Sequence, residues 1–540
     1  MMSNDINRRD FLGMSGASML STIVHGSAGV EQGDRQQPEL TPGQSHLSRQ
    51  PNIVMFMPDE MRADALACYG NPVTKTPNFD RLAREGARFS NCHVQFPVCG
   101  ASRCSMLTGW PTSVRGHRSL FYFLRPEEPN LFRYLRQAGY DVFWFGKNDA
   151  LAAASFYDSV TRWRDSSGEG IAPPAGFTPN GFTMLYPPAG DRRETGDYKM
   201  LRATFEVLDR KESERPFCIF LPLNEPHPPY TIPADFYNMY SPGSLPPLAP
   251  PDLPKKPAFH AAIRKSYGLS KVDDRTLRQV RAVYYGQVSY SDWLAGELLA
   301  KLESTGRDKD TALFVLSDHG DYAGDYGLVE KWPSGLEDCL THVPLLVRTP
   351  GGKPGVVADD MVELYDVMQT SLDLAATKAQ HTHFSRSLVP QLNGNPGDPE
   401  RAAFAEAGYN IYEPQCFEPE GPNVRGPYIA KIGLQNRQPN TVSRSAMVRT
   451  RTHKLIRRPH DESELYDVKA DPQELRNLYG EVSATEIQQT LQTKLLDHYL
   501  DTTGIAPMDK DPRNCPPFYP TRADLSVGTW QRDLLDQSRP

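Results

Sequence analysis

Four short runs of apolar residues, each followed by polar residues, are the clearest pattern in the chain. Residues 52–57, 142–145, 217–221 and 311–316 are almost continuously apolar, and helical patterns separate them. Runs of this length predict parallel strands that helices bury on both faces. In open α/β sheets, ligands bind at the edge where the strands end. The pattern therefore predicts an α/β fold with a site at the carboxyl edge of its sheet.

Helices are predicted between these strands, with recognisable ends. Thr76 is a candidate N-cap for a helix over 77–85, which has proline at its first position and Gly86 as its end. A long amphipathic pattern over about 276–302 predicts a second helix, whose aromatic and aliphatic face belongs to the core. A further strand is expected over 343–347.

The N-terminus carries an export pattern. Two adjacent arginines at 8–9 precede Asp-Phe-Leu and a short apolar run over 11–24. The run is too short to span a bilayer comfortably, and the paired arginines resemble a twin-arginine export signal. We therefore expect residues 1–30 to be a signal peptide and 31–48 to be a linker. The mature protein is expected to be exported to the periplasm or the medium of a bacterium, without a transmembrane anchor.

Composition narrows the function classes. The 540 residues are 39% hydrophobic and 23% charged, which is ordinary for a globular protein. The net charge is −7, and lysine and arginine are scattered, so no nucleic-acid partner is expected. The eight cysteines lack paired zinc-type spacing, so neither a zinc module nor a disulfide framework is predicted.

The stretch 97–109, PVCGASRCSMLTG, carries the most specific chemical signal. Residues 101–107 predict a helix that ends at Gly109, which puts Cys99 just before a helix N-terminus. Free N–H groups and the helix dipole favour an anion there, and Arg103 can reach back over the cysteine from the same helix face. A buried structural cysteine is the commonest use of such a residue, and a low-pKa nucleophilic thiol is a second alternative.

The order Cys99-x-Ala-Ser-Arg103 before Met-Leu-Thr-Gly109 resembles the Cys-x-Pro-Ser-Arg signature of the sulfatase family. The resemblance covers roughly residues 50–500 and is to formylglycine-dependent enzymes of the alkaline phosphatase superfamily, such as iduronate-sulfatase- and choline-sulfatase-like arylsulfatases. It implies that Cys99 is oxidised after translation to formylglycine (3-oxoalanine), whose hydrate is the nucleophile. Ala101 stands in place of the family's proline, which implies a radical, anaerobic type of maturing enzyme.

Two pairs of metal-binding residue types follow predicted strands. Asp59 and Glu60 follow the first strand, and Asp318 and His319 follow the strand over 311–316. Oxygen-dominated coordination suits a hard divalent cation better than zinc. The resemblance implies one Ca²⁺ held by these four residues and by the formylglycine oxygen at Cys99, with Glu60 in place of a common second Asp. A histidine in the fourth position also accommodates Mg²⁺ or Mn²⁺.

The resemblance further implies which residues contact the sulfate and its leaving oxygen. The matching positions are Arg103, Lys147, His227 and Lys331. The family's Gly-Lys-x-His is here Gly146-Lys147-Asn148-Asp149. Asp149 is therefore the expected proton acceptor, and His117 and His342 are the alternatives.

The implied function is a sulfuric ester hydrolase that releases inorganic sulfate from a sulfated carbohydrate or a small sulfate ester. The nucleophile at position 99 attacks sulfur, His227 or Lys331 protonates the departing alcohol, and sulfate then leaves as the aldehyde reforms. Two alternatives remain open. One is a formylglycine-dependent hydrolase of phosphonate monoesters or phosphodiesters, and the other is a non-catalytic protein that binds sulfated glycans and keeps Cys99 unconverted.

A smaller unit is predicted in the C-terminal part. The α/β pattern runs to about residue 405, and the Pro- and Gly-rich stretch 414–427 predicts a boundary. Residues 446–456 predict paired short strands, and the segment 464–478 resembles the C-terminal subdomain of the sulfatases. We expect a large mixed, mostly parallel sheet sandwiched by helices, and a smaller α+β subdomain of antiparallel strands and a helix. The expected ranges are 49–410 for the catalytic domain, 411–510 for the subdomain and 511–540 for an unassigned tail.

Overall fold

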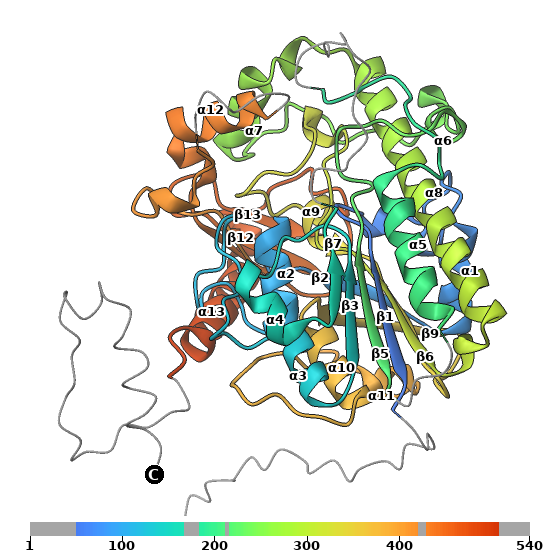
Figure 1. Cartoon of the computed structure of the whole chain (residues 1–540). Helices are drawn as coiled ribbons and strands as arrows, with labels where there is room; N and C mark the ends of the chain where they lie inside the picture. The colour runs from blue at the N-terminus through green and yellow to red at the C-terminus, as the bar shows by residue number, and fades with distance from the viewer. Residues whose placement is uncertain (1–49, 167–182, 211–214, 420–427, 507–540) are drawn as a thin grey trace, which may run out of the picture. The chain divides into compact units, whose positions relative to one another are not determined.

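The computed structural model describes residues 50–166, 183–210, 215–419 and 428–506 (Figure 1). The predicted signal peptide, the linker up to residue 48 and the tail over 511–540 lie outside these residues. Within the described part of the chain, no helix has the length and apolar character needed to cross a membrane.

A nine-stranded sheet carries the four predicted strands side by side. The order is β4-β3-β5-β1-β6-β8-β2-β7, and β9 pairs with β2. The first five strands are mutually parallel, β8 runs antiparallel to both β6 and β2, and β9 is parallel to β2. The expected mixed, mostly parallel sheet is confirmed. The strands are β1 (Asn52–Met57), β2 (Ala87–His93), β3 (Asp141–Phe145), β4 (Arg162–Arg164), β5 (Phe217–Pro222), β6 (Thr311–Leu316), β7 (His342–Val343), β8 (Leu345–Arg348) and β9 (Val356–Glu363).

Helices cover both faces of this sheet (Figure 1). Alternate residues of a strand point to opposite faces, so Val54 and Phe56 of β1 pack with α1, α5 and α8, whereas Ile53 and Met55 pack with α2, α3, α4 and α10. The helices are α1 (Pro77–Glu85), α2 (Cys99–Thr108), α3 (Leu131–Gln137), α4 (Phe156–Ser159), α5 (Gly196–Leu208), α6 (Ala234–Tyr237), α7 (Ala258–Ser266), α8 (Asp274–Ser304), α9 (Asp338–Thr341), α10 (Asp366–Leu374), α11 (Val389–Leu392), α12 (Ile429–Arg437) and α13 (Thr485–Thr502).

The structure differs from the sequence predictions in two local details. The strand expected over 343–347 is divided into β7 and β8 at Pro344, which has no N–H to donate to a ladder. Thr76 does lie at the N-cap of α1, but its hydroxyl accepts from the Ala67 N–H at 3.0 Å. The Asp292 carboxylate of α8 takes the capping role, because it accepts from the Phe79 N–H of α1 at 2.7 Å.

Aromatic packing on the α3 face of the sheet leads to a stability prediction. Phe220 of β5 is fully buried, and its ring centroid lies 5.2 Å from that of Phe132 and 4.7 Å from that of Trp144. We expect Phe220→Ala to lower the free energy of unfolding by about 3–5 kcal/mol, because the cavity cannot collapse between two other large rings. Urea denaturation measures this, with the exposed Phe121→Ala as the control. Equal losses in the two variants would contradict the prediction.

The C-terminal part contains a second, four-stranded antiparallel sheet in the order β10-β11-β12-β13. The paired strands predicted over 446–456 are confirmed as β11 and β12, and α13 packs Leu491 and Leu495 against this sheet. Its edge strand β10 comes from residues before the expected boundary at 411. The strands are β10 (Ala403–Ala407), β11 (Ser445–Arg449), β12 (His453–Arg457) and β13 (Glu464–Asp467).

Candidate active site

The carboxyl ends of four adjacent parallel strands supply the site, as the apolar pattern predicts. Asp59 follows β1, Asp318 follows β6, Lys147 follows β3 and His227 follows β5. Apart from the alternative proton acceptors His117 and His342, direct contacts link the predicted site residues into one cluster, with the Glu60 N–H joined to Asp318 Oδ1 at 3.1 Å. Its members are Asp59, Glu60, Cys99, Arg103, Lys147, Asp149, His227, Asp318, His319 and Lys331.

Cys99 lies at the centre of this cluster. It is the first residue of α2, which begins two residues earlier than the sequence predicts and ends at Gly109 as expected. The buried Cys99 Sγ lies 3.1 Å from His319 Nε2, 3.5 Å from Asp59 Oδ1 and 3.9 Å from Lys147 Nζ. Burial and the Asp59 carboxylate raise the pKa of the Cys99 thiol well above its ordinary value. This environment opposes the thiolate that an unmodified cysteine nucleophile needs.

Arg103 bridges the carboxylates of Asp59 and Asp318. Its Nε donates to Asp318 Oδ2 at 2.8 Å, and its Nη2 donates to Asp59 Oδ2 at 3.0 Å. The guanidinium is fully buried, so these charge-assisted bonds fix the orientation of both carboxylates. Asp59 Oδ1 is then left 3.5 Å from Cys99 Sγ, and Asp318 Oδ1 accepts from the Glu60 N–H at 3.1 Å.

Four donor atoms converge on one point. Within the described residues, ligand atoms of Asp59, Cys99, Asp318 and His319 all lie within 4.8 Å of one another. His319 Nε2 is 3.7 Å from Asp59 Oδ1 and 4.0 Å from Asp318 Oδ1, and His319 Nδ1 bonds to the Gly320 carbonyl at 2.9 Å. That bond leaves the Nε2 lone pair free to face a metal ion. Two carboxylates, an imidazole and a group at position 99 fit a hard divalent cation.

The electrostatics of Asp59 agree with an ionised ligand. Burial raises the pKa of the Asp59 carboxyl, but the positive charges of Lys147 and Arg103 outweigh burial and leave the pKa well below the ordinary value. Lys147 Nζ donates to Asp59 Oδ2 at 2.6 Å. The carboxylate is therefore charged and oriented before any ion binds.

The Glu60 side chain pairs with Lys331 and His227. Its Oε2 accepts from Lys331 Nζ at 2.8 Å and is 3.4 Å from His227 Nε2. It belongs to a second group of metal-binding residue types, with Asp59 and His227, and not to the group that contains Cys99. Burial raises the pKa of the Glu60 carboxyl well above its ordinary value, against the opposing charge of Lys331.

His227 and Lys331 form a hydrogen-bonded pair. His227 Nδ1 bonds to the Pro228 carbonyl at 2.6 Å, so Nδ1 carries the proton and Nε2 is the acceptor. Lys331 Nζ donates to this Nε2 at 2.9 Å. Burial and the charges of Lys331 and Lys147 lower the pKa of His227 well below its ordinary value, so the ring is neutral. The ammonium is the member of the pair that holds a transferable proton.

The three candidate proton acceptors lie in different places. Asp149 Oδ2 is 3.1 Å from Lys147 Nζ, which links this carboxylate to the site. His117 bonds to Glu128 Oε1 at 2.9 Å, and His342 bonds to the Ser90 carbonyl at 2.8 Å. Among the polar contacts of Cys99 that the described residues make, neither histidine appears.

Two charged residues that the sequence analysis did not identify lie next to this cluster. Glu330 Oε1 is 3.4 Å from Lys331 Nζ, and Lys431 Nζ of α12 is 2.8 Å from the same Glu330 oxygen. Glu330 precedes Lys331 directly, so its position alone was a usable signal. Lys431 lies a hundred residues further on, in a helix with no motif, so nothing in the sequence marks it.

Comparison with known proteins gives the family. The family model described as Sulfatase matches residues 51–377, which is more than half of the chain and contains the whole cluster. The chain belongs to the sulfatase family. A second model, N-sulphoglucosamine sulphohydrolase C-terminal, matches residues 435–500 of this sulfatase, from the end of α12 through β11, β12 and β13 to most of α13. Family membership makes the protein a hydrolase of the class that acts on sulfuric esters.

Individual relatives agree with the family. This sulfatase is 27% identical over 377 residues to an arylsulfatase of Clostridium perfringens. The aligned region covers 60% of this chain and 75% of the relative. It is 24% identical over 520 residues to an N-acetylglucosamine-6-O-sulfatase of Bacteroides thetaiotaomicron. The aligned region covers 84% of this chain and 87% of the relative. The solved structure of the phosphonate monoester hydrolase of Agrobacterium radiobacter has the same fold, with a TM-score of 0.68 and 23% identity. The superposition covers 86% of this chain and 100% of that chain.

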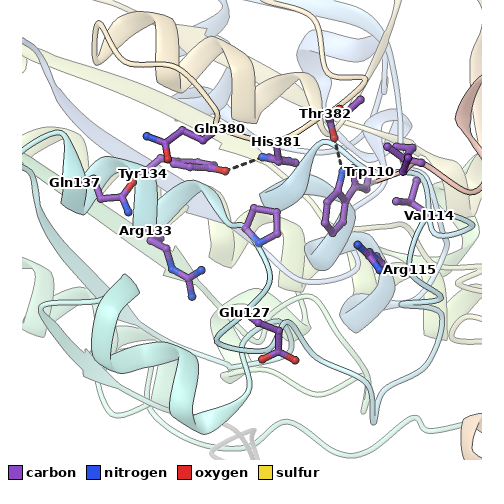
Figure 2. Close-up of a pocket in the computed structure, with 13 residues that line it drawn as sticks. Trp110, Val114, Arg115, Glu127, Arg133, Tyr134, Gln137, Gln380, His381 and Thr382 are labelled. Atoms are coloured by element: carbon purple, nitrogen blue, oxygen red, sulfur yellow. Dashed lines mark hydrogen bonds between the residues drawn. The ribbon is translucent and has the colours of Figure 1, made fainter. Parts of the chain in front are cut away.

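A separate pocket of about 360 Å³ lies away from the cluster (Figure 2). Trp110, Tyr134 and His381 line it, and Arg115 and Arg133 flank them. His381 bonds to the carbonyl of Thr108, the last residue of α2. A helix rises 1.5 Å per residue, so Thr108 lies about 14 Å along the helix axis from Cys99, at the other end of α2. None of the predicted site residues lines this pocket.

The His381 ring in this pocket predicts a loss of stability in acid. Its Nε2 donates to the Thr108 carbonyl at 2.7 Å, and in the neutral ring its Nδ1 accepts from the Tyr134 hydroxyl at 2.8 Å (Figure 2). Burial lowers the pKa of His381 from 6.5 to about 4. The unfolded chain therefore binds the extra proton first, and the stabilisation present above pH 6.5 is lost as the pH falls towards 4.

We expect this histidine to contribute up to about 3 kcal/mol to the loss of unfolding free energy over that range. The measurement is urea denaturation of wild type and His381→Gln at several pH values. The variant should show a flatter dependence of unfolding free energy on pH than the wild type. Parallel pH profiles for the two proteins would refute the assignment.

Proposed function

We propose that this sulfatase hydrolyses sulfuric esters with a formylglycine formed from Cys99, and that a divalent cation assists it. The observation that carries the proposal is the position of Cys99 Sγ, which lies 3.1 Å from His319 Nε2 and 3.5 Å from Asp59 Oδ1 at the carboxyl edge of the sheet. A hydrated aldehyde at this position supplies the nucleophilic oxygen. A separate maturing enzyme, of the radical type that Ala101 implies, oxidises the cysteine.

We propose that Asp59, Asp318, His319 and residue 99 hold the cation. Ca²⁺ fits the oxygen-rich donors, and the imidazole also suits Mg²⁺ or Mn²⁺. A bound cation polarises a sulfate oxygen and lowers the pKa of the hydroxyl at position 99. Glu60, whose carboxylate pairs with Lys331 at 2.8 Å, is proposed as the partner of that lysine in place of a fifth ligand.

The remaining residues have separate roles in this proposal. Arg103 and Lys147 balance the negative charge of the transferred group. The sulfur–oxygen bond to the alcohol breaks, and the alcohol oxygen takes a proton from the Lys331 ammonium, which His227 orients through its Nε2. Asp149, held by Lys147 at 3.1 Å, takes the proton from the remaining hydroxyl at position 99 before inorganic sulfate departs.

The substrate is proposed to be a sulfated carbohydrate or a small sulfate ester. Relatives over most of the chain include an N-acetylglucosamine-6-O-sulfatase and a choline-sulfatase of Rhizobium meliloti, which is 26% identical over 465 residues. We propose that the protein meets such esters after export, since its N-terminal sequence has the pattern of a twin-arginine signal.

The test compares, for a single protein preparation, the kcat/KM values for a sulfate ester and for two phosphorus esters. Protein co-expressed with a radical-type maturing enzyme is assayed with 4-nitrophenyl sulfate, a 4-nitrophenyl phosphonate monoester and bis(4-nitrophenyl) phosphate. We expect the highest kcat/KM with the sulfate. A higher kcat/KM with either phosphorus ester favours the phosphonate or phosphodiester hydrolase. Saturable binding of sulfated glycans without sulfate release, from protein with a thiol at position 99, identifies the binding protein.

A further inference from the structure

A chain of alternating basic and acidic side chains runs from the C-terminal part of the molecule to the site. Lys431 Nζ of α12 is 2.8 Å from Glu330 Oε1, Glu330 Oε1 is 3.4 Å from Lys331 Nζ, and Lys331 Nζ is 2.8 Å from Glu60 Oε2. The side chains of these four residues are at most 4% exposed. In such surroundings, removal of one charge leaves its partner without compensation.

The two carboxylates that flank Lys331 both sit on unusual backbone. Glu60 has φ of 71° and Glu330 has φ of 61°, in the left-handed region that residues with a Cβ rarely adopt. The Glu330 N–H donates to the Tyr230 hydroxyl at 2.8 Å, which helps to hold this conformation. Such a backbone conformation persists only where the surrounding contacts hold it in place. It is found most often at functional sites.

The start of α12 also approaches the histidine of the pair. The hydroxyl of Tyr428, at the N-cap of α12, is 3.5 Å from the Pro228 carbonyl. The same carbonyl accepts from His227 Nδ1 at 2.6 Å and so fixes which ring nitrogen faces Lys331. Helix α12 therefore contacts both the Glu330 carboxylate beside Lys331 and the Pro228 carbonyl that orients His227.

We propose that Lys431 is a positioning residue for the leaving-group side of the site. It neutralises Glu330, and Lys331 then stays between Glu60 and His227, directed to the departing oxygen. Without Lys431, Lys331 is the nearest cation left to the Glu330 carboxylate, which draws the ammonium away. The inference rests on the proposed function, because it gives Lys331 the task of protonating the alcohol.

A series of substituted phenyl sulfates tests this role, because phenols of high pKa need the proton and 4-nitrophenol hardly does. For Lys431→Met we expect kcat/KM to fall about 30-fold more for the poorest leaving group than for 4-nitrophenyl sulfate. Lys431→Arg keeps the charge and should restore the wild-type dependence on leaving-group pKa. The double variant Lys431→Met with Glu330→Gln removes both charges, and its dependence should be closer to wild type than that of Lys431→Met alone.

Lys454→Met is the matched control, because Lys454 is an equally buried lysine of the C-terminal part that pairs with Asp338 at 2.8 Å and with Glu474 at 2.6 Å. It should lower stability without changing the dependence on leaving-group pKa. A uniform fall in kcat/KM across the series for Lys431→Met, or no fall, would overturn the positioning role. Failure of the proposed function is distinguishable, because the mature wild-type protein would then release no sulfate from any member of the series.

Discussion

The Cys99→Ala protein is expected to lose sulfate release by at least about 10⁴-fold in kcat, because no other group replaces a nucleophile that forms the new bond to sulfur. The fold should survive, since Cys99 is the first residue of α2 and Ala is a good helix former, whereas the metal site keeps only three of its four proposed donors. The measurement is sulfate release by wild type and variant prepared with the same maturing enzyme, with the thermal unfolding midpoint as a check on folding.

Cys104→Ala supplies the matched control for this loss. Cys104 lies in the same helix, is also buried, and bonds weakly to the Ala150 carbonyl at 3.6 Å. Its removal should cost some stability and leave kcat close to the wild-type value. Equal kcat values for Cys99→Ala and wild type would exclude a nucleophile at position 99, and equal losses in the two cysteine variants would point to a packing effect.

The second large effect is expected from Asp318→Ala. This carboxylate is among the four converging donors, and its Oδ2 accepts from Arg103 Nε at 2.8 Å. The variant should therefore lose both the bound cation and the fixed guanidinium, and kcat/KM should fall by at least about 10³-fold. Metal analysis of the purified protein should give about one divalent ion per wild-type chain and almost none per variant chain.

Asp292→Asn provides the control for loss of a buried carboxylate. Asp292 caps α1 and lies outside the four converging donors, so this variant should lower the unfolding midpoint and keep both metal and activity. Treatment of wild type with a chelator should abolish sulfate release, and addition of Ca²⁺, Mg²⁺ or Mn²⁺ in turn identifies the preferred ion. Full activity in metal-free wild type would contradict the proposed role of the cation.

The sequence predicts the layout of this site well because the signals are local. A continuous apolar run followed by acidic residues, as at Met57–Asp59 and Leu316–Asp318, fixes both the strand and the edge at which the carboxylates appear. The short motif around Cys99 likewise predicts a helix start beside a reactive position. In the structure α2 begins two residues before the predicted start.

The parts that the sequence did not predict depend on contacts between distant segments. Asp292 and not Thr76 caps α1, because α8 passes close to the start of that helix. Glu60 pairs with Lys331 and has a left-handed backbone conformation, and no sequence pattern predicts either feature. Lys431 reaches the site only because α12 folds back over a hundred residues, so its role is visible only in three dimensions.

The state of residue 99 is the most direct test of the central claim. Trypsin releases the peptide 89–103, which also contains Cys92 of β2 as an internal unmodified thiol. Mass spectrometry of active, natively matured protein should show that residue 99 has exchanged its sulfur and two hydrogens for one oxygen, and a hydrazide reagent should label it while Cys92 remains a thiol. A fully active preparation in which residue 99 is still an unmodified cysteine would contradict the account.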